Sequence, residues 1–92
     1  MKVIQKQSFG KSVKKLHANQ KASLDEAIRM LCENPLGGEL KKGDLAGVRV
    51  YKFQMVSLMA LLAYQYDAQK EELILLKIAS HENFYRDLKE QF

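Results

Sequence analysis

The spacing of hydrophobic positions changes part-way along the chain. In the first third, apolar residues recur at helical spacing in two groups, which are Phe9, Val13 and Leu16, and then Leu24, Ile28 and Leu31. This spacing predicts two amphipathic helices, the first capped by Ser8 and the second by Asn19. Pro35 biases Asn34 out of helical geometry, so it ends the second helix. We therefore expect a helical hairpin.

From Val48 onward the apolar pattern alternates with a period of two. It predicts three strands, at Val48–Met55, Leu58–Tyr66 and Glu72–Ala79. The connections between them are short, and short connections imply an antiparallel meander. The middle strand is apolar on both faces, so it should be the most buried of the three.

The remaining segments complete an α+β domain. Lys2–Gln7 alternates and predicts a short edge strand, the four glycines of Leu36–Gly47 predict a structured loop, and a short C-terminal helix is expected from His81. In such a domain the helical hairpin packs on one face of the sheet and leaves the other free. Arg49 and Lys52 alternate to opposite faces, and the sequence alone leaves open which of them faces the helices.

The composition indicates a single folded domain that is neither disulfide-bonded nor membrane-spanning. The 92 residues, of which 47% are hydrophobic, predict one folded domain over residues 1–92. Cys32 is the only cysteine, which excludes an intramolecular disulfide and any metal site built on several cysteines. No apolar run approaches the roughly 20 residues of a membrane span, and the first residues lack the apolar stretch of a secretion signal. We expect a cytoplasmic protein without membrane contact.

The net charge of +4 is unevenly distributed. Residues 1–21 contain six lysines and no carboxylate. A second basic block contains Lys41, Lys42, Arg49 and Lys52, with Asp44 as its one acid. If the two blocks converge, they would attract nucleic acid or an acidic protein segment. Alternatively, the N-terminal lysines only solvate a helix surface.

The end of the chain concentrates side chains suited to phosphodiester chemistry. His81 can exchange protons near neutral pH, Arg86 can neutralise a phosphate, and Tyr85 can stack on a base. In a helix, His81 and Tyr85 would lie four residues apart on one face. The structural alternative is that His81 caps this helix and Tyr85 anchors it on the sheet.

Three segments together resemble the RelE/ParE superfamily of toxins from type II toxin–antitoxin systems. They are Leu40–Phe53, the apolar strand that ends in Tyr64, and Ser80–Leu88. The resemblance implies the RelE-like microbial ribonuclease fold and a toxin that cuts messenger RNA in the ribosome without a metal or other cofactor. It also implies a tightly bound cognate antitoxin, with operator DNA bound only through the antitoxin complex.

The resemblance suggests the catalytic residues. Lys52 falls where RelE-like toxins place a basic residue, and His81 falls where the YafQ-like branch places a catalytic histidine. Tyr85 matches that branch's aromatic residue, and Arg49 resembles an arginine at the start of its equivalent strand. RNA cleavage through the 2′-hydroxyl needs proton transfer and a cation at the phosphorane, which His81 and either Lys52 or Arg49 would supply.

The resemblance to RelE is incomplete, because this chain lacks some of the basic residues that RelE has. Lys41, Lys42 and Arg86 are expected to bind RNA. However, Val50 stands where RelE has a second lysine, and Leu61 or a neighbour stands where RelE has an arginine. Catalysis should therefore depend on the histidine, in the manner of the YafQ-like branch.

Two alternatives to the ribosome-dependent endonuclease stay open at this point. A ParE-type toxin would inhibit DNA gyrase and leave messages intact. A non-catalytic module would serve only with its antitoxin in binding operator DNA.

Overall fold

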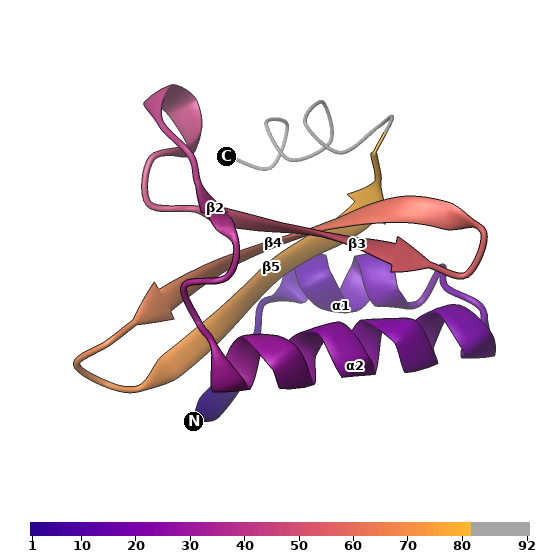
Figure 1. Ribbon diagram of the computed structural model, residues 1–92, viewed down its shortest axis with the longest axis horizontal. Coiled ribbons are helices and arrows are strands. Elements are labelled where there is room, and N and C mark those ends of the chain that lie inside the picture. Colours follow the sequence, from indigo (N-terminus) through magenta and orange to yellow (C-terminus); the bar gives the residue numbers. More distant parts are fainter. Residues whose placement is uncertain (82–92) are drawn as a thin grey trace.

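The computed structural model describes residues 1–81 as a five-stranded mixed sheet with two α-helices on one side (Figure 1). The elements are β1 (Lys2–Gln5), α1 (Gln7–Val13), α2 (Ala18–Glu33), β2 (Glu39–Leu40), the 3₁₀ helix η1 (Gly43–Leu45), β3 (Arg49–Met55), β4 (Leu58–Asp67) and β5 (Glu72–Ser80). The order of strands across the sheet is β1-β5-β4-β3-β2. The predicted α+β class is confirmed.

The antiparallel meander of β3, β4 and β5 is also confirmed. Lys52 pairs with Leu61 and Ala60 pairs with Ser80, so the three strands run side by side with a fixed register. β4 occupies the centre of the sheet, and residues 60–64 of this strand are all buried, as its apolar pattern predicted. A register shift between Ala63 and Tyr64 marks a bulge in the pairing of β4 with β5.

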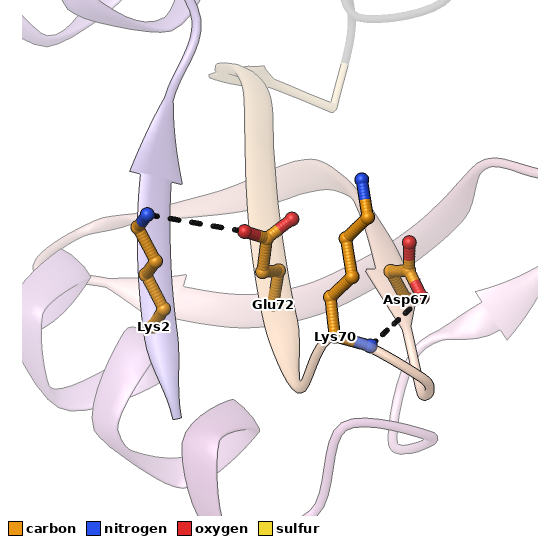
Figure 2. Close-up of polar contacts among 4 residues, drawn as sticks. All are labelled: Lys2, Asp67, Lys70 and Glu72. Atoms are coloured by element: carbon orange, nitrogen blue, oxygen red, sulfur yellow. Dashed lines mark hydrogen bonds and ion pairs between the residues drawn. The ribbon is translucent and has the colours of Figure 1, made fainter.

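β1 joins the far edge of the sheet, where it pairs in parallel with β5. Figure 2 shows the start of this pairing, where the Lys2 ammonium lies 4.0 Å from the Glu72 carboxylate. The neighbouring β4–β5 turn is closed by Asp67, whose Oδ1 accepts hydrogen bonds from the backbone N–H groups of Gln69 and Lys70. Figure 2 shows the bond from Lys70. Charges at this end of the molecule are thus of mixed sign.

The helix starts differ from the predicted caps. The N-cap of α1 is Lys6, and the Ser8 hydroxyl donates instead to the backbone oxygen of Leu76 on β5, at 2.7 Å. α2 begins before Asn19, because His17 is its N-cap and forms a reciprocal capping box with Gln20. Ser8 is thus used to attach α1 to β5, which the local sequence could not reveal.

The other boundaries move by a few residues. The first strand ends at Gln5 because α1 already starts at Gln7, whereas β5 continues to Ser80. α2 ends at Glu33, with Asn34 in a non-helical conformation before Pro35, as predicted. The predicted C-terminal helix falls in residues 82–92, outside the described residues.

The expected loop between Leu36 and Gly47 contains two short elements, β2 and η1. Gly43 and Gly47 have φ angles of 68° and 86°, a region that glycine adopts without steric cost. These turns bring Leu45 onto the sheet face opposite the helices, where the loop rises above the sheet in Figure 1. Within residues 1–81, no helix is both long and apolar enough to cross a membrane.

Candidate active site on the open face of the sheet

The two faces of the sheet are packed by different clusters. Tyr51 and Phe53, whose rings stack at 5.9 Å, belong to the cluster beneath the helices. Val50 belongs instead to a second cluster on the opposite side, together with Leu45 and Leu61. We call this second side the open face, because α1 and α2 do not cover it. Strand alternation then places Lys52 on the open face.

A hollow of about 560 Å³ lies at the end of the sheet where β4 begins and β5 ends, beside Lys52 of β3. Its described lining residues are Lys52, Leu58, Met59, Ser80 and His81. The backbone N–H of His81 donates to the Met59 carbonyl at 3.1 Å, which continues the β4–β5 pairing and fixes His81 opposite Met59. Met59 is two residues from Leu61, the partner of Lys52, so Lys52 and His81 share this face.

The hollow brings an ammonium group and an imidazole to one surface from segments 29 positions apart in the sequence. Strand spacing and residue rise put the Cα atoms of Lys52 and His81 on the order of 12 Å apart. Both side chains are exposed and long enough to converge on a group bound between them. Such a pair can neutralise a phosphate and move a proton.

Arg49 takes a different position from the other predicted catalytic residues. It lies on the helix side of β3, where its Nη1 donates to the backbone oxygen of Gly38 at 3.0 Å. The Gly38 N–H donates to the Tyr64 hydroxyl at 2.8 Å, and that hydroxyl donates to the Pro35 oxygen at 2.7 Å. These three bonds fasten the segment after α2 to the sheet, so Arg49 is not brought together with Lys52 and His81.

The packing around Gly38 is close. A Cβ atom at this position would lie 2.7 Å from the Tyr64 ring and hydroxyl, so only glycine fits without displacement. Tyr64 is completely buried. Burial raises the pKa of the Tyr64 phenol, while the hydrogen bond from Gly38 and the nearby charge of Arg49 act in the opposite direction.

The predicted RNA-binding residues are dispersed. Lys41 forms an ion pair with Glu39 at 3.2 Å, and Lys42 is exposed at the start of η1. Both lie beyond the β2 end of β3, apart from the hollow at the opposite end of that strand. Tyr85 and Arg86 lie outside the described residues.

Two features of the described chain were missed by the sequence interpretation. The four tyrosines gave no local signal that Tyr64 would bind Gly38, because the two residues are 26 positions apart. Lys77 lies in a strand pattern and is only 9% exposed, next to the bulge in β5. The position of this lysine inside an apolar strand was the sequence signal that could have indicated its burial.

The family comparison covers most of the chain. A family described as "ParE-like toxin of type II bacterial toxin-antitoxin system" matches residues 3–89. No curated protein sequence matches.

The chain is also similar to solved toxin structures. It aligns with the RelBE2 toxin–antitoxin complex of Mycobacterium tuberculosis at a TM-score of 0.76 and 21% identity, covering 87% of this chain and 96% of that one. The free E. coli toxin RelE, as a mutant, gives a TM-score of 0.74 at 16% identity, covering 99% and 96%. The intact E. coli RelBE complex gives 0.68 at 18% identity, covering 86% and 94%. These similarities show a RelE-like fold.

Proposed function

The chain belongs to the ParE-like toxins of type II bacterial toxin–antitoxin systems, and from this premise we propose that it cuts messenger RNA on the ribosome. The observation that carries the proposal is the hollow on the open face, where Lys52 and His81 come together. The resemblance to the RelE/ParE superfamily and the RelE-like fold are both confirmed. The cleavage activity is our inference from the site.

The proposed reaction uses the RNA's own 2′-hydroxyl as nucleophile. Its oxygen attacks the adjacent phosphorus while the bond to the 5′-oxygen breaks, which leaves a 2′,3′-cyclic phosphate and a 5′-hydroxyl end. One proton must leave the nucleophile and one must reach the 5′-oxygen, and His81 carries one of these transfers. Lys52 stabilises the additional negative charge of the phosphorane.

The cognate antitoxin is the proposed inhibitor. Its acidic side chains would pair with the basic surface of the toxin, and its apolar side chains would fill grooves. One such groove lies between α2 and β3 and includes Met30, Tyr51 and Phe53. We further propose that the toxin acts in the cytoplasm on ribosomes and mRNA, and that operator DNA is bound only through the antitoxin complex.

A gyrase inhibitor is the second candidate, and one observation favours it. Val50 and Leu61, at positions where the RelE resemblance implied basic residues, are buried in the apolar cluster of the open face. This face therefore presents fewer cations to RNA than the resemblance implied. The family description, which refers to ParE, agrees with this candidate.

One experiment separates the two candidates. Purified toxin is added to translating ribosomes, and RNA ends are mapped and tested for cyclic phosphate. A parallel reaction measures supercoiling by DNA gyrase. We expect new cyclic-phosphate ends on ribosome-bound messages, unchanged supercoiling, and loss of cleavage after addition of the antitoxin. Intact messages together with inhibited supercoiling would reject the endonuclease and favour the gyrase inhibitor.

A further inference from the structure

The outer edge of β3 is paired along only part of its length. β2 pairs with Arg49 and Val50, and within residues 1–81 no strand continues this pairing along Tyr51–Met55 (Figure 1). On the other side, β4 pairs with the whole of β3. The second half of β3 is therefore bonded to a neighbouring strand on one side only.

Alternation along β3 identifies the backbone groups that lack a strand. The Lys41 N–H donates to the Val48 carbonyl, so Val48 and every second residue after it direct their backbone groups toward this outer edge. In the second half of β3 these residues are Lys52 and Gln54. Both are exposed, and no hydrogen bond within residues 1–81 reaches their outward N–H and C=O groups.

The edge of β5 beyond β1 differs in this respect. There the Ser8 hydroxyl donates to the Leu76 carbonyl, and the Ser12 hydroxyl accepts from the Ile78 N–H at 3.2 Å. Two side chains of α1 thus bind backbone groups that no strand pairs. The edge of β3 has no such cover within residues 1–81, and an open edge is a template for an additional strand.

A groove of about 400 Å³ lies beside this open edge, between β3 and α2. Its α2 wall includes the small residues Ala22, Ser23 and Ala27, and its β3 wall includes Tyr51 and Phe53. Small side chains on the helix leave room for the side chains of an added strand. Those on the helix side of the sheet would contact the two aromatic residues, so apolar side chains fit there.

The other face of the same edge is basic. Lys52 lies on the open face, and within residues 1–81 its ammonium group has no ion pair. An antiparallel strand places the side chain opposite Lys52 on this same face, with the two Cβ atoms roughly 5 Å apart. A carboxylate at that position would pair with the ammonium group.

We propose that the antitoxin adds an extended segment to β3 along Tyr51–Met55, an inference that rests on the proposed function. The segment has apolar side chains opposite Tyr51 and Phe53 and a carboxylate opposite Lys52. The ion pair occupies the cation that would otherwise neutralise the phosphate of the RNA. Antitoxin and RNA therefore compete for Lys52.

Amide hydrogen exchange tests the added strand. It is measured on ¹⁵N-labelled toxin, alone and saturated with its antitoxin. The amides of Lys52 and Gln54 should exchange at least about tenfold more slowly in the complex, because each gains a hydrogen bond. The amides of Tyr51 and Phe53 are internal controls, since they already face β4 and should change much less. Unchanged exchange of Lys52 and Gln54 in the saturated complex would overturn the proposal.

Gln54→Pro removes one outward N–H and leaves every charge of the toxin in place. Proline is tolerated where the N–H of an edge strand faces solvent. The affinity for the antitoxin should fall on the order of tenfold, because a carbonyl of the added strand loses its donor. Wild-type affinity of Gln54→Pro would overturn the proposal. If this variant does not fold, the exchange measurement decides.

Gln5→Pro is the matched control, because it removes an outward N–H from the opposite edge of the sheet. The Lys2 and Lys6 N–H groups point toward β5, so that of Gln5 faces outward. Gln5→Pro should bind the antitoxin as the wild type does.

Lys52→Met tests the carboxylate. It keeps the backbone edge, so the antitoxin should still protect the Gln54 amide, but affinity should fall several-fold and depend less on salt. Lys70→Met removes the same charge from the β4–β5 turn and should bind as the wild type does (Figure 2). Affinity and salt dependence of Lys52→Met equal to those of the wild type would overturn the proposed ion pair.

The exchange measurement also separates this proposal from the proposed function, because it needs neither RNA nor ribosomes. Protected Lys52 and Gln54 amides in a toxin that inhibits gyrase would support the added strand and reject only the endonuclease. Cleavage that depends on His81, together with an unprotected edge in the complex, would reject the strand and leave the endonuclease standing. An antitoxin helix in the groove would leave both edge amides in fast exchange and would likewise reject the strand.

Discussion

Arg49 and Lys52 are cations three residues apart on β3, yet they lie on opposite faces of the sheet and have different surroundings. Arg49 lies beneath the loop after α2 and donates to the Gly38 carbonyl. Lys52 lies on the open face, in the same hollow as His81. Residue type made both candidates for catalysis, whereas strand alternation and the position of the helices assign only Lys52 to the open face.

The polar groups on the two faces differ in the same way. On the helix side, the Tyr64 hydroxyl both accepts and donates hydrogen bonds inside the protein. On the open face, the side chains of Lys52 and His81 are exposed to solvent and available to a ligand. Substitutions on the helix side should therefore affect stability, and those on the open face should affect activity.

The largest expected effect is that of His81→Ala. Cleavage on translating ribosomes should fall by roughly 10²- to 10⁴-fold, which is the usual contribution of a positioned proton carrier. The melting temperature should stay unchanged, since the His81 side chain is exposed. Added imidazole should restore part of the rate. Cleavage by His81→Ala at the wild-type rate would place the chemistry elsewhere.

Lys52→Met should lower the cleavage rate by about 10²- to 10³-fold, because one preorganised charge at the phosphorane is removed. Lys52→Arg should retain much of the rate. Arg49→Met is the matched control, since it removes an equal charge from the same strand on the other face. It should lose about 1 kcal/mol of stability with its hydrogen bond and keep the rate per folded molecule. A lower cleavage rate for Arg49→Met together with an unchanged rate for Lys52→Met would contradict the assignment of the two residues to their faces.

Tyr64→Phe should destabilise the protein by about 1–3 kcal/mol, because the buried Gly38 N–H and the Pro35 oxygen both lose their partner. Urea unfolding followed by circular dichroism measures this free energy. Tyr66→Phe is the control, because Tyr66 is only partly buried. Equal stability of the Tyr64→Phe protein and the wild type would show that these hydrogen bonds do not hold the loop.

The smallest effect is a dependence of stability on alkaline pH. Burial raises the pKa of Tyr64 in the folded state, so above the ordinary tyrosine value of about 10 the unfolded chain loses this proton more readily. Stability should be fully present below pH 10 and should fall as the pH rises through the pKa of folded Tyr64. The difference between wild type and Tyr64→Phe, measured from pH 8 to 11, isolates this contribution. A difference independent of pH would contradict it.

The sequence predicted those elements whose signal is local. The helical spacing of Phe9 and Leu24 located α1 and α2, and the period-two pattern from Val48 located the meander. The caps at Ser8 and Asn19 were wrong. The Ser8 hydroxyl donates a hydrogen bond to the backbone oxygen of Leu76, 68 residues away. Helix-capping patterns consider only neighbouring residues, so they could not predict this contact.

The candidate site was partly accessible from the sequence. Lys52 and His81 were identified by residue type and resemblance, and the structure brings them to one hollow. The location of Arg49 depended on which face of β3 the helices cover, and alternation alone cannot decide this. The Tyr64–Gly38 contact and the buried Lys77 depend on packing between distant segments.

The central claim is that RNA binds the open face of the sheet and not the helix side. The methionine methyl groups test it most directly, because the chain has four methionines. Met59 is 37% exposed and lines the hollow with Lys52 and His81, whereas Met30 is 52% exposed on α2 at the helix side. A ¹³C-methyl spectrum is recorded while a 2′-deoxy-blocked dinucleotide is added to saturation. We expect the Met59 signal to shift with RNA concentration and the Met30 signal to stay in place. A shift of Met30 without a shift of Met59 would contradict the claim that RNA binds the open face.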